Sequence, residues 1–295
     1  MPPLRRTSGT HLRRRAAADA SAILHRRSRL AFRRRRHGLT LHILVTNDDG
    51  IDSPGIVALV EALSRDHDVM VVAPSGDRSG MSHSITGNVA ITLERRSGLS
   101  ASAYACSGTP ADCAFLGSTE LGGRPDLVVS GINYGPNLAD DINYSGTVAG
   151  AVEACLLGIP ALAVSLACEY ERPSGGPHWE AAAEIVRRCI QRGYDTFSDV
   201  RYYWNLNVPD VALDAIRGIA VTRLGRKRIC GRMIGADSDG GASYYRAWES
   251  PFETDRETVG TDIGAVHAGY ASLTPLVLDR TASSAPGGSE TFAEL

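Results

Sequence analysis

The sequence predicts an α/β protein with a doubly wound, mostly parallel sheet. Residues 41–73 contain a strand, a helix and a second strand in succession, which is a β-α-β unit with an expected right-handed crossover. Short apolar runs continue to alternate with helical patterns further along the chain. The composition is that of a globular protein, with 43% hydrophobic and 22% charged residues in a chain of 295.

The first β-α-β unit has the clearest pattern. Residues 41–46 form a short apolar run that ends in a polar loop, which is typical of a buried parallel strand. Ser53 and Pro54 then start a helix, because a hydroxyl suits the N-cap and proline suits the first helical position. Apolar residues between 56 and 63 recur at helical spacing, and 68–73 is the next strand.

Later elements follow from the same patterns. The further expected strands are 126–130, 161–166, 203–208, 219–222 and 273–278, and the further expected helices are 145–157, 178–191 and one that begins at Ala111. Gly193 is expected to close the helix over 178–191. Residues 224–265 are rich in Gly, Asp and Arg, and are expected to form an irregular excursion or an oligomerisation arm.

The charge is distributed unevenly. Residues 1–40 carry 12 of the 31 basic residues, all of them Arg, and a single acid, Asp19, which leaves 19 basic and 32 acidic residues in the rest of the chain. An acidic body repels a phosphate backbone, so no nucleic-acid partner is expected for the folded core. The folded domain is expected over 41–280.

Both ends are expected to lie outside this fold, as an Arg-rich disordered extension over 1–40 and a flexible tail over 281–295. Three interpretations of the extension stay open. It can be an organellar transit peptide, a basic tail for nucleic acid or membrane surfaces, or a solvated tail translated from an upstream start codon.

The six cysteines form no CxxC pair, and no apolar signal-peptide core precedes them. Free thiols in a reducing compartment are therefore expected, which indicates a cytoplasmic protein. No apolar run approaches the roughly 18 residues of a membrane span, so no membrane association is expected.

Polar, glycine-rich loops follow three of the expected strands, and ligands bind at the carboxyl ends of strands in open α/β sheets. Asp48 and Asp49 follow the first strand, Ser79 lies in the loop after the second, and Asn133 follows the strand over 126–130. Two adjacent carboxylates with hydroxyl and amide oxygens suit one divalent cation, Mg²⁺ or Mn²⁺, better than zinc. The alternative is a turn, for which Asn-Asp-Asp-Gly is ordinary chemistry.

Two further segments can bind a phosphate group. Ser145, Gly146 and Thr147 open a helix, whose free N–H groups and positive dipole end attract anions, although a plain N-cap explains the same residues. The turn at Thr109 can contact substrate or serve only as a turn. His83 lies near the Ser79 loop and can act as an acid or as a loop hydrogen-bonder.

The sequence resembles the survival protein SurE family of metal-dependent 5′-nucleotidases. The resemblance covers about residues 41–280 and leaves out the 1–40 extension. It is carried, in chain order, by VTNDDGI at 45–51, VAP at 72–74, RSG at 78–80, GTPADC at 108–113, VSGIN at 129–133, GPNL at 135–138, YSGTVA at 144–149, GIPALAVS at 158–165, NLNVP at 205–209, GTD at 260–262 and GY at 269–270 with TPL at 274–276.

The resemblance implies a Rossmann-like, three-layer α/β/α fold with a C-terminal hairpin or arm exchanged between subunits of a homodimer or homotetramer. It implies one divalent cation per subunit held by Asp48, Asp49, Ser79 and Asn133. The implied reaction is hydrolysis of nucleoside 5′-monophosphates, with broader phosphomonoesterase activity as an extension.

In this interpretation Asp48 and Asp49 are catalytic, and Asp49 is the expected water-orienting residue. Asn133, Ser145, Gly146, Thr147 and Thr109 are the expected phosphate-binding residues. Two alternatives stay open. One is a phosphatase of the haloacid-dehalogenase type, which needs Asp-x-Asp where this chain has adjacent aspartates. The other is a nucleotide-sensing or stress-associated binding module without turnover.

Overall fold

The structure is a computed structural model that describes residues 39–168, 176–228, 231–238, 241–248, 252–253, 256–258 and 260–281. The main sheet has nine strands in the order β3-β4-β2-β1-β5-β6-β7-β13-β8. Its strands are β1 (His42–Thr46), β2 (Asp68–Pro74), β3 (Leu93–Arg96), β4 (Ser102–Cys106), β5 (Leu127–Tyr134), β6 (Ala161–Ala167), β7 (Tyr203–Pro209), β8 (Ile219–Val221) and β13 (Ala271–Leu276).

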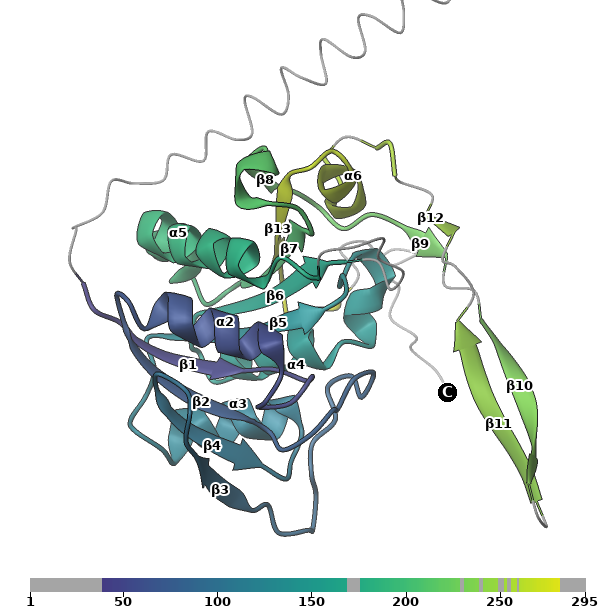
Figure 1. Cartoon of the computed structure of the whole chain (residues 1–295), viewed down its shortest axis with the longest axis horizontal. Helices are drawn as coiled ribbons and strands as arrows, with labels where there is room; N and C mark the ends of the chain where they lie inside the picture. The colour runs from purple at the N-terminus through teal and green to yellow at the C-terminus, as the bar shows by residue number, and fades with distance from the viewer. Residues whose placement is uncertain are drawn as a thin grey trace, which may run out of the picture.

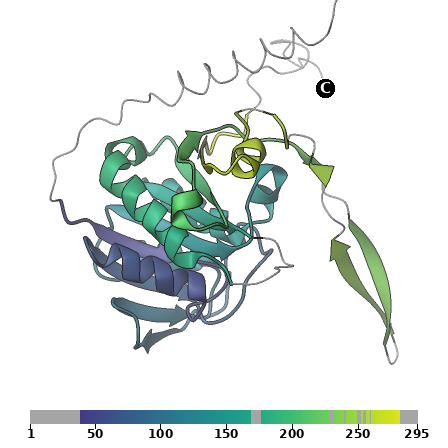
Figure 2. The same ribbon diagram turned by 45° about the horizontal axis from the view of Figure 1, so that its top comes forward.

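Helices cover both faces of this sheet, which confirms the predicted three-layer α/β class (Figures 1 and 2). α2 (Pro54–Leu63) packs against α5 (Trp179–Phe197), and α3 (Pro110–Thr119) packs against α4 (Gly146–Leu156). Alternate residues of a strand face opposite sides of a sheet. Accordingly Ile43 belongs to the core under α2 and α5, while Leu44 belongs to the core under α3 and α4.

The connections create a switch point between β1 and β5. β1 pairs in parallel with β2 on one side and with β5 on the other, and the chain then builds outward to β4 and to β6 and β7. Both edges depart from the parallel arrangement, because β3 is antiparallel to β4 and β13 is antiparallel to β7. The carboxyl ends of β1 and β5 therefore meet where such sheets bind ligands.

The predicted end of one helix was wrong, and two strands were not predicted. α5 does not end at Gly193 but continues to Phe197, whose ring is fully buried and meets Trp204 edge-on at 5.7 Å. Burial of an aromatic ring contributes more than the roughly 1 kcal/mol that a helical glycine costs. β3 and β4 were not predicted at all, because their short runs show little apolar patterning.

The region expected to be irregular, 224–265, contains regular strands. β10 (Gly231–Ser238) and β11 (Gly241–Trp248) form an antiparallel hairpin that projects from the body of the molecule (Figures 1 and 2). β9 (Lys227–Arg228) and β12 (Phe252–Glu253) pair at its base, and α6 (Asp262–His267) follows. Its role as an exchanged arm stays a prediction.

Several sequence predictions concern residues outside or at the edge of the described part. The extension over 1–40 and the tail over 281–295 lie almost wholly outside the described residues. The five cysteines within the described ranges are buried. Cys106, Cys113, Cys155 and Cys189 are free, as expected, and Cys230 lies outside those ranges. Among the described helices, none has the length and apolar character needed to cross a bilayer.

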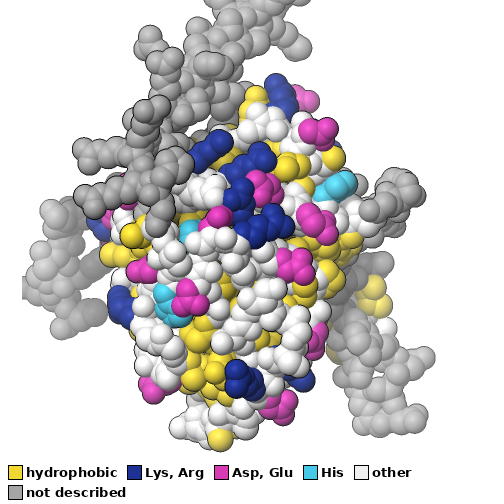
Figure 3. Space-filling view, turned by 60° about the vertical axis from the view of Figure 1, so that its left-hand side comes forward, with side chains coloured by type: hydrophobic (Ala, Val, Ile, Leu, Met, Phe, Trp, Pro, Cys, Tyr) yellow, Lys and Arg dark blue, Asp and Glu magenta, His cyan; other side chains and the backbone are white. Residues whose placement is uncertain are grey.

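Charged side chains of both signs are mixed on the face that carries α5 (Figure 3). On that face Arg187 pairs with Glu184 at 2.8 Å and with Asp66 at 2.7 Å, which ties α5 to the end of α2.

Candidate active site at the carboxyl ends of β1 and β5

Asp48 is the most buried acid of the candidate site. Only Asn47 separates it from the end of β1, it is 3% exposed, and its carboxylate accepts a hydrogen bond from the hydroxyl of Thr147 at the start of α4. Burial raises the pKa of Asp48 to about 6, opposed by the hydrogen bonds from the Thr147 side chain and backbone and reinforced by the charge of Asp49.

Asp49 joins the first strand to the end of β5. Its carboxylate accepts a hydrogen bond from the Tyr134 N–H at 3.0 Å. Burial raises the pKa of Asp49, while the bond from Tyr134 lowers it and the charge of Asp77 raises it. Asn133, the residue before Tyr134, is thereby brought to the same edge of the sheet.

The loop after β2 is held against Asp48. The Arg78 N–H donates to the Asp48 carbonyl at 2.7 Å, which fixes Ser79 beside the aspartate pair. Gly50, in the loop after β1, packs closely on Gly76 in the loop after β2. Its φ of +98° favours glycine, and a Cβ added there would lie 3.1 Å from Gly76. The predicted convergence of the loops after β1, β2 and β5 is therefore present.

The start of α4 packs directly on the Asp48 carboxylate. A Cβ added to Gly146 would lie 2.8 Å from both Cβ and Oδ2 of Asp48, so no larger residue fits without displacing the carboxylate. Ser145 is the N-cap, and its hydroxyl oxygen accepts from the Val148 N–H at 3.0 Å. The N-cap interpretation of Ser145 is thus correct, and its hydroxyl hydrogen remains available to a ligand.

The aspartate pair and its neighbours have the chemistry of a hard cation site. Within the described residues no Arg or Lys side chain pairs with Asp48 or Asp49, and no cluster of three His, Cys, Asp or Glu side chains is arranged for a metal. Hydroxyl and amide oxygens must therefore complete any ligand set. Asn133 donates through Nδ2 to the Gly135 carbonyl at 2.9 Å, which leaves Oδ1 as an acceptor.

Asp77 is a member of the site that the sequence did not single out. Its carboxylate accepts from the Ser79 N–H at 2.8 Å and from the Ser79 hydroxyl at 2.5 Å. This bonding orients Ser79 and leaves the lone pairs of its hydroxyl oxygen available. An aspartate two residues before a serine is common in turns. What sets Asp77 apart from an ordinary turn residue is that its charge raises the pKa of Asp49.

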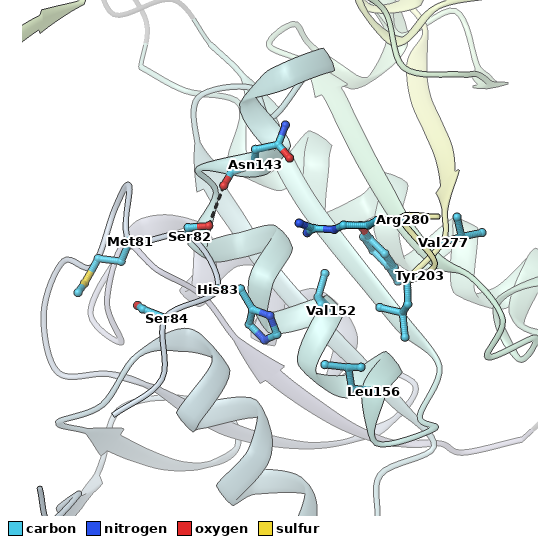
Figure 4. A pocket seen from close by; sticks show the side chains of 11 residues that line it. Met81, Ser82, His83, Ser84, Asn143, Val152, Leu156, Tyr203, Val277 and Arg280 are labelled. Atoms are coloured by element: carbon cyan, nitrogen blue, oxygen red, sulfur yellow. Dashed lines mark hydrogen bonds between the residues drawn. The ribbon is translucent and has the colours of Figure 1, made fainter. Parts of the chain in front are cut away.

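Two candidate residues, Thr109 and His83, form their hydrogen bonds with residues other than Asp48 and Asp49. Thr109 caps α3, bonds Asp112 in a capping box, and donates to the Ser84 carbonyl at 2.8 Å. His83 pairs with Glu153 at 2.8 Å and lines a cavity of about 640 Å³, whose lining includes neither Asp48 nor Asp49 (Figure 4). Their contact with substrate stays a prediction.

Comparison with known proteins places this geometry in a family. The family profile described as survival protein SurE matches residues 43–230. The chain belongs to the survival protein SurE family. A 5′-nucleotidase SurE from Pelobacter propionicus is 45% identical over 244 residues, covering 82% of this chain and 95% of that protein.

Further relatives agree with this assignment. A 5′/3′-nucleotidase SurE from Photorhabdus laumondii is 42% identical over 83% of this SurE-family chain and 93% of that protein. The crystal structure of the SurE protein from Aquifex aeolicus matches with a TM-score of 0.69 and 38% identity, over 81% of this chain and 94% of that one. The resemblance seen in the sequence and the predicted Rossmann-like fold are confirmed.

Proposed function

We propose that this chain is a metal-dependent nucleotidase that hydrolyses nucleoside 5′-monophosphates to nucleosides and inorganic phosphate. The observation that carries the proposal is the buried Asp48 beside Asp49, at the switch point of the sheet and against the N-terminus of α4. The names of the relatives, 5′-nucleotidase and 5′/3′-nucleotidase, support the same reaction.

Asp48, Asp49, Ser79 and Asn133 would hold one divalent cation, Mg²⁺ or Mn²⁺. Their support is the fit of an oxygen-only donor set to an aspartate pair that lacks a basic partner among the described residues. When bound, such a cation neutralises phosphate oxygens and lowers the pKa of a coordinated water.

The remaining steps belong to the protein. The Ser145 hydroxyl and the Gly146 N–H at the start of α4 bind phosphate oxygens, because the helix start supplies donors and a positive dipole end. Asp49, half-buried and bonded to the Tyr134 N–H, orients the attacking water and accepts its proton. The packing of Gly146 on Asp48 fixes the distance between the two halves of the site.

The test is a phosphate-release panel on the full chain. The substrates are 5′- and 3′-nucleoside monophosphates and a simple phosphate ester, each with Mg²⁺, Mn²⁺ or EDTA. We expect release from 5′-monophosphates that EDTA abolishes and that Asp49→Asn lowers at least a hundredfold. Asp52→Asn is the matched control, because Asp52 is an exposed carboxylate three residues further along the same loop.

Each alternative has its own outcome. Tight nucleotide binding with no turnover under either metal indicates the binding module. A trapped phosphoenzyme indicates an aspartyl nucleophile. Undiminished release in EDTA, or a fully active Asp49→Asn, contradicts the proposal.

The proposal extends to assembly and location. We propose a homodimer or homotetramer joined through the β10–β11 hairpin, because an isolated two-stranded sheet is marginal in water and Met233, Ile234 and Tyr244 are exposed on it. A cytoplasmic location is supported by the free cysteines of the described part.

A further inference from the structure

We propose that Asn205 and Asn207 on β7 are positioning residues of the active site, which fix the backbone of Asn137 and through it the amide of Asn133. This inference rests on the proposed function of the aspartate site. It concerns a cluster that lies two strands away from β5, in a part of the sheet with no direct bond to Asp48 or Asp49 among the hydrogen bonds of the described residues.

The two asparagines hydrogen-bond the backbone of one residue, Asn137. Asn207 accepts the Asn137 N–H through Oδ1 at 2.8 Å and donates through Nδ2 to the Asn137 carbonyl at 3.1 Å. Asn205 donates to the same carbonyl at 2.8 Å. A side-chain amide that bonds both the N–H and the C=O of one residue replaces the pairing that a neighbouring strand would give. The loop after β5 is thereby anchored to β7.

The burial of this cluster is unusual for amides. Asn205, Asn207 and Ser165 have no exposed surface, and Asn137 is 7% exposed. Burying an amide costs free energy unless it is hydrogen-bonded, and Oδ1 of Asn205 has no partner within the described structure. An apolar residue at 205 would avoid that cost. The presence of amides at these positions is therefore better explained by their hydrogen bonds to the Asn137 backbone than by a contribution to core stability.

The sheet register connects this cluster to the metal-ligand candidate. Asn133 on β5 is in register with Ser165 on β6, and Ser165 is in register with Asn207 on β7. Adjacent strands lie about 4.8 Å apart, so Asn207 lies about 10 Å from Asn133 along this row. The loop that begins after Asn133 folds back over the row, where Nδ2 of Asn137 donates to the Ser165 hydroxyl at 2.8 Å.

The loop transmits the anchoring to Asn133. Gly135 donates its N–H to the Leu166 carbonyl at 3.0 Å, and its own carbonyl accepts from Nδ2 of Asn133 at 2.9 Å. The position of the Gly135 carbonyl therefore decides which way Oδ1 of Asn133 points. Release of Asn137, two residues later, would leave this part of the loop held only through the Gly135 N–H, and the looser carbonyl would hold Asn133 less firmly in the orientation that a ligand oxygen needs.

The test compares Asn207→Ala with Ser272→Ala. Ser272 is equally buried and in register with Asn207 on β13, but its hydroxyl bonds Thr222 at 2.8 Å rather than the loop. Three readouts are used on the full chain: amide hydrogen exchange over 135–139 without metal, Mn²⁺ affinity by calorimetry, and kcat and KM for a nucleoside 5′-monophosphate.

We expect Asn207→Ala to speed exchange at the Asn137 amide, to weaken Mn²⁺ binding about 10- to 100-fold and to lower kcat by a similar factor. Ser272→Ala should lose Tm without these changes. Asn207→Asp, which keeps the acceptor for the Asn137 N–H but loses the donor, should fall between wild type and Asn207→Ala. If Asn207→Ala does not fold, the same three measurements are made on Asn205→Ala, which removes only one of the three hydrogen bonds to the Asn137 backbone.

Equal metal affinity and equal exchange in Asn207→Ala and Ser272→Ala, at a comparable loss of Tm, would overturn the inference. Failure of the proposed function has a different signature. In that case the wild-type chain releases no phosphate from any nucleotide, whereas the exchange and Mn²⁺ measurements require no turnover and still test the role of Asn207.

Discussion

Replacement of Asp48 by Asn should make the metal-free protein more stable above neutral pH. Asp48 is 3% exposed in the wild type, and burial raises the pKa of its carboxyl group from 3.8 to about 6. Asn keeps an acceptor for the Thr147 donors and carries no charge, so Asp48→Asn removes the desolvated charge while it keeps those hydrogen bonds.

The magnitude follows from linkage between protonation and folding. A separation of about two pH units between the folded and unfolded pKa corresponds to about 3 kcal/mol, at 1.36 kcal/mol per unit. Because the folded pKa is the higher one, this stabilisation is fully present below pH 3.8 and is lost as the pH rises through 6. The raised pKa of Asp49 acts in the same direction.

Urea unfolding followed by circular dichroism, in EDTA at a series of pH values from about 3.5 to 7.5, measures this effect. Wild type should lose about 3 kcal/mol more than Asp48→Asn across the series, and Asp52→Asn should follow wild type. Mn²⁺ at about 100 times its Kd should then restore about 2.7 kcal/mol at pH 7.5 to wild type alone. Parallel stability curves for wild type and Asp48→Asn would refute this reasoning.

Three other predictions follow from the same contacts. Gly146→Ala places a Cβ 2.8 Å from Asp48 and should lower phosphate release about a hundredfold, while Tm changes little; full activity would contradict the packing. Thr147→Val removes the hydroxyl donor and should move the pH midpoint of the urea series upward, and an unchanged midpoint would speak against that bond. Deletion of 231–248 should lower the mass measured by light scattering to that of a monomer, unless the hairpin does not join subunits.

The sequence was sufficient to place the aspartate pair because its signal is local. Only Asn47 separates the apolar run over 41–46 from Asp48, and two residues separate the strand over 126–130 from Asn133, so strand ends alone bring these residues to one edge of the sheet. β3 and β4 escaped prediction because they carry charged residues and alanines without alternation. β4 is placed in the sheet by its long-range pairing with β2, and β3 is placed by its pairing with β4.

Asn207 and Asp77 were missed for a related reason. Asn207 lies inside an apolar strand. The neighbouring residues in the sequence do not show whether its amide bonds a loop 70 residues away or faces solvent at the edge of the sheet. Asp77 resembles an ordinary turn residue, and its relation to Asp49 is visible only once the loops after β1 and β2 are packed together. Side chains whose role depends on tertiary contact carry no periodic signal.

The start of α4 shows how a correct motif can have a more specific use than the sequence suggests. Its residues were expected to bind phosphate, but Thr147 gives its hydroxyl and its backbone N–H to Asp48, and the Val148 N–H is used by the Ser145 cap. The Gly146 N–H, which has no intrahelical carbonyl, and the Ser145 hydroxyl are the donors left for a phosphate oxygen. Two anions, the aspartate and a phosphate, would then share one helix end whose dipole is worth only about half a charge. A divalent cation held by Asp48 and Asp49 would supply the missing positive charge, which is the electrostatic reason for proposing that the helix start and the aspartate pair act together with a metal.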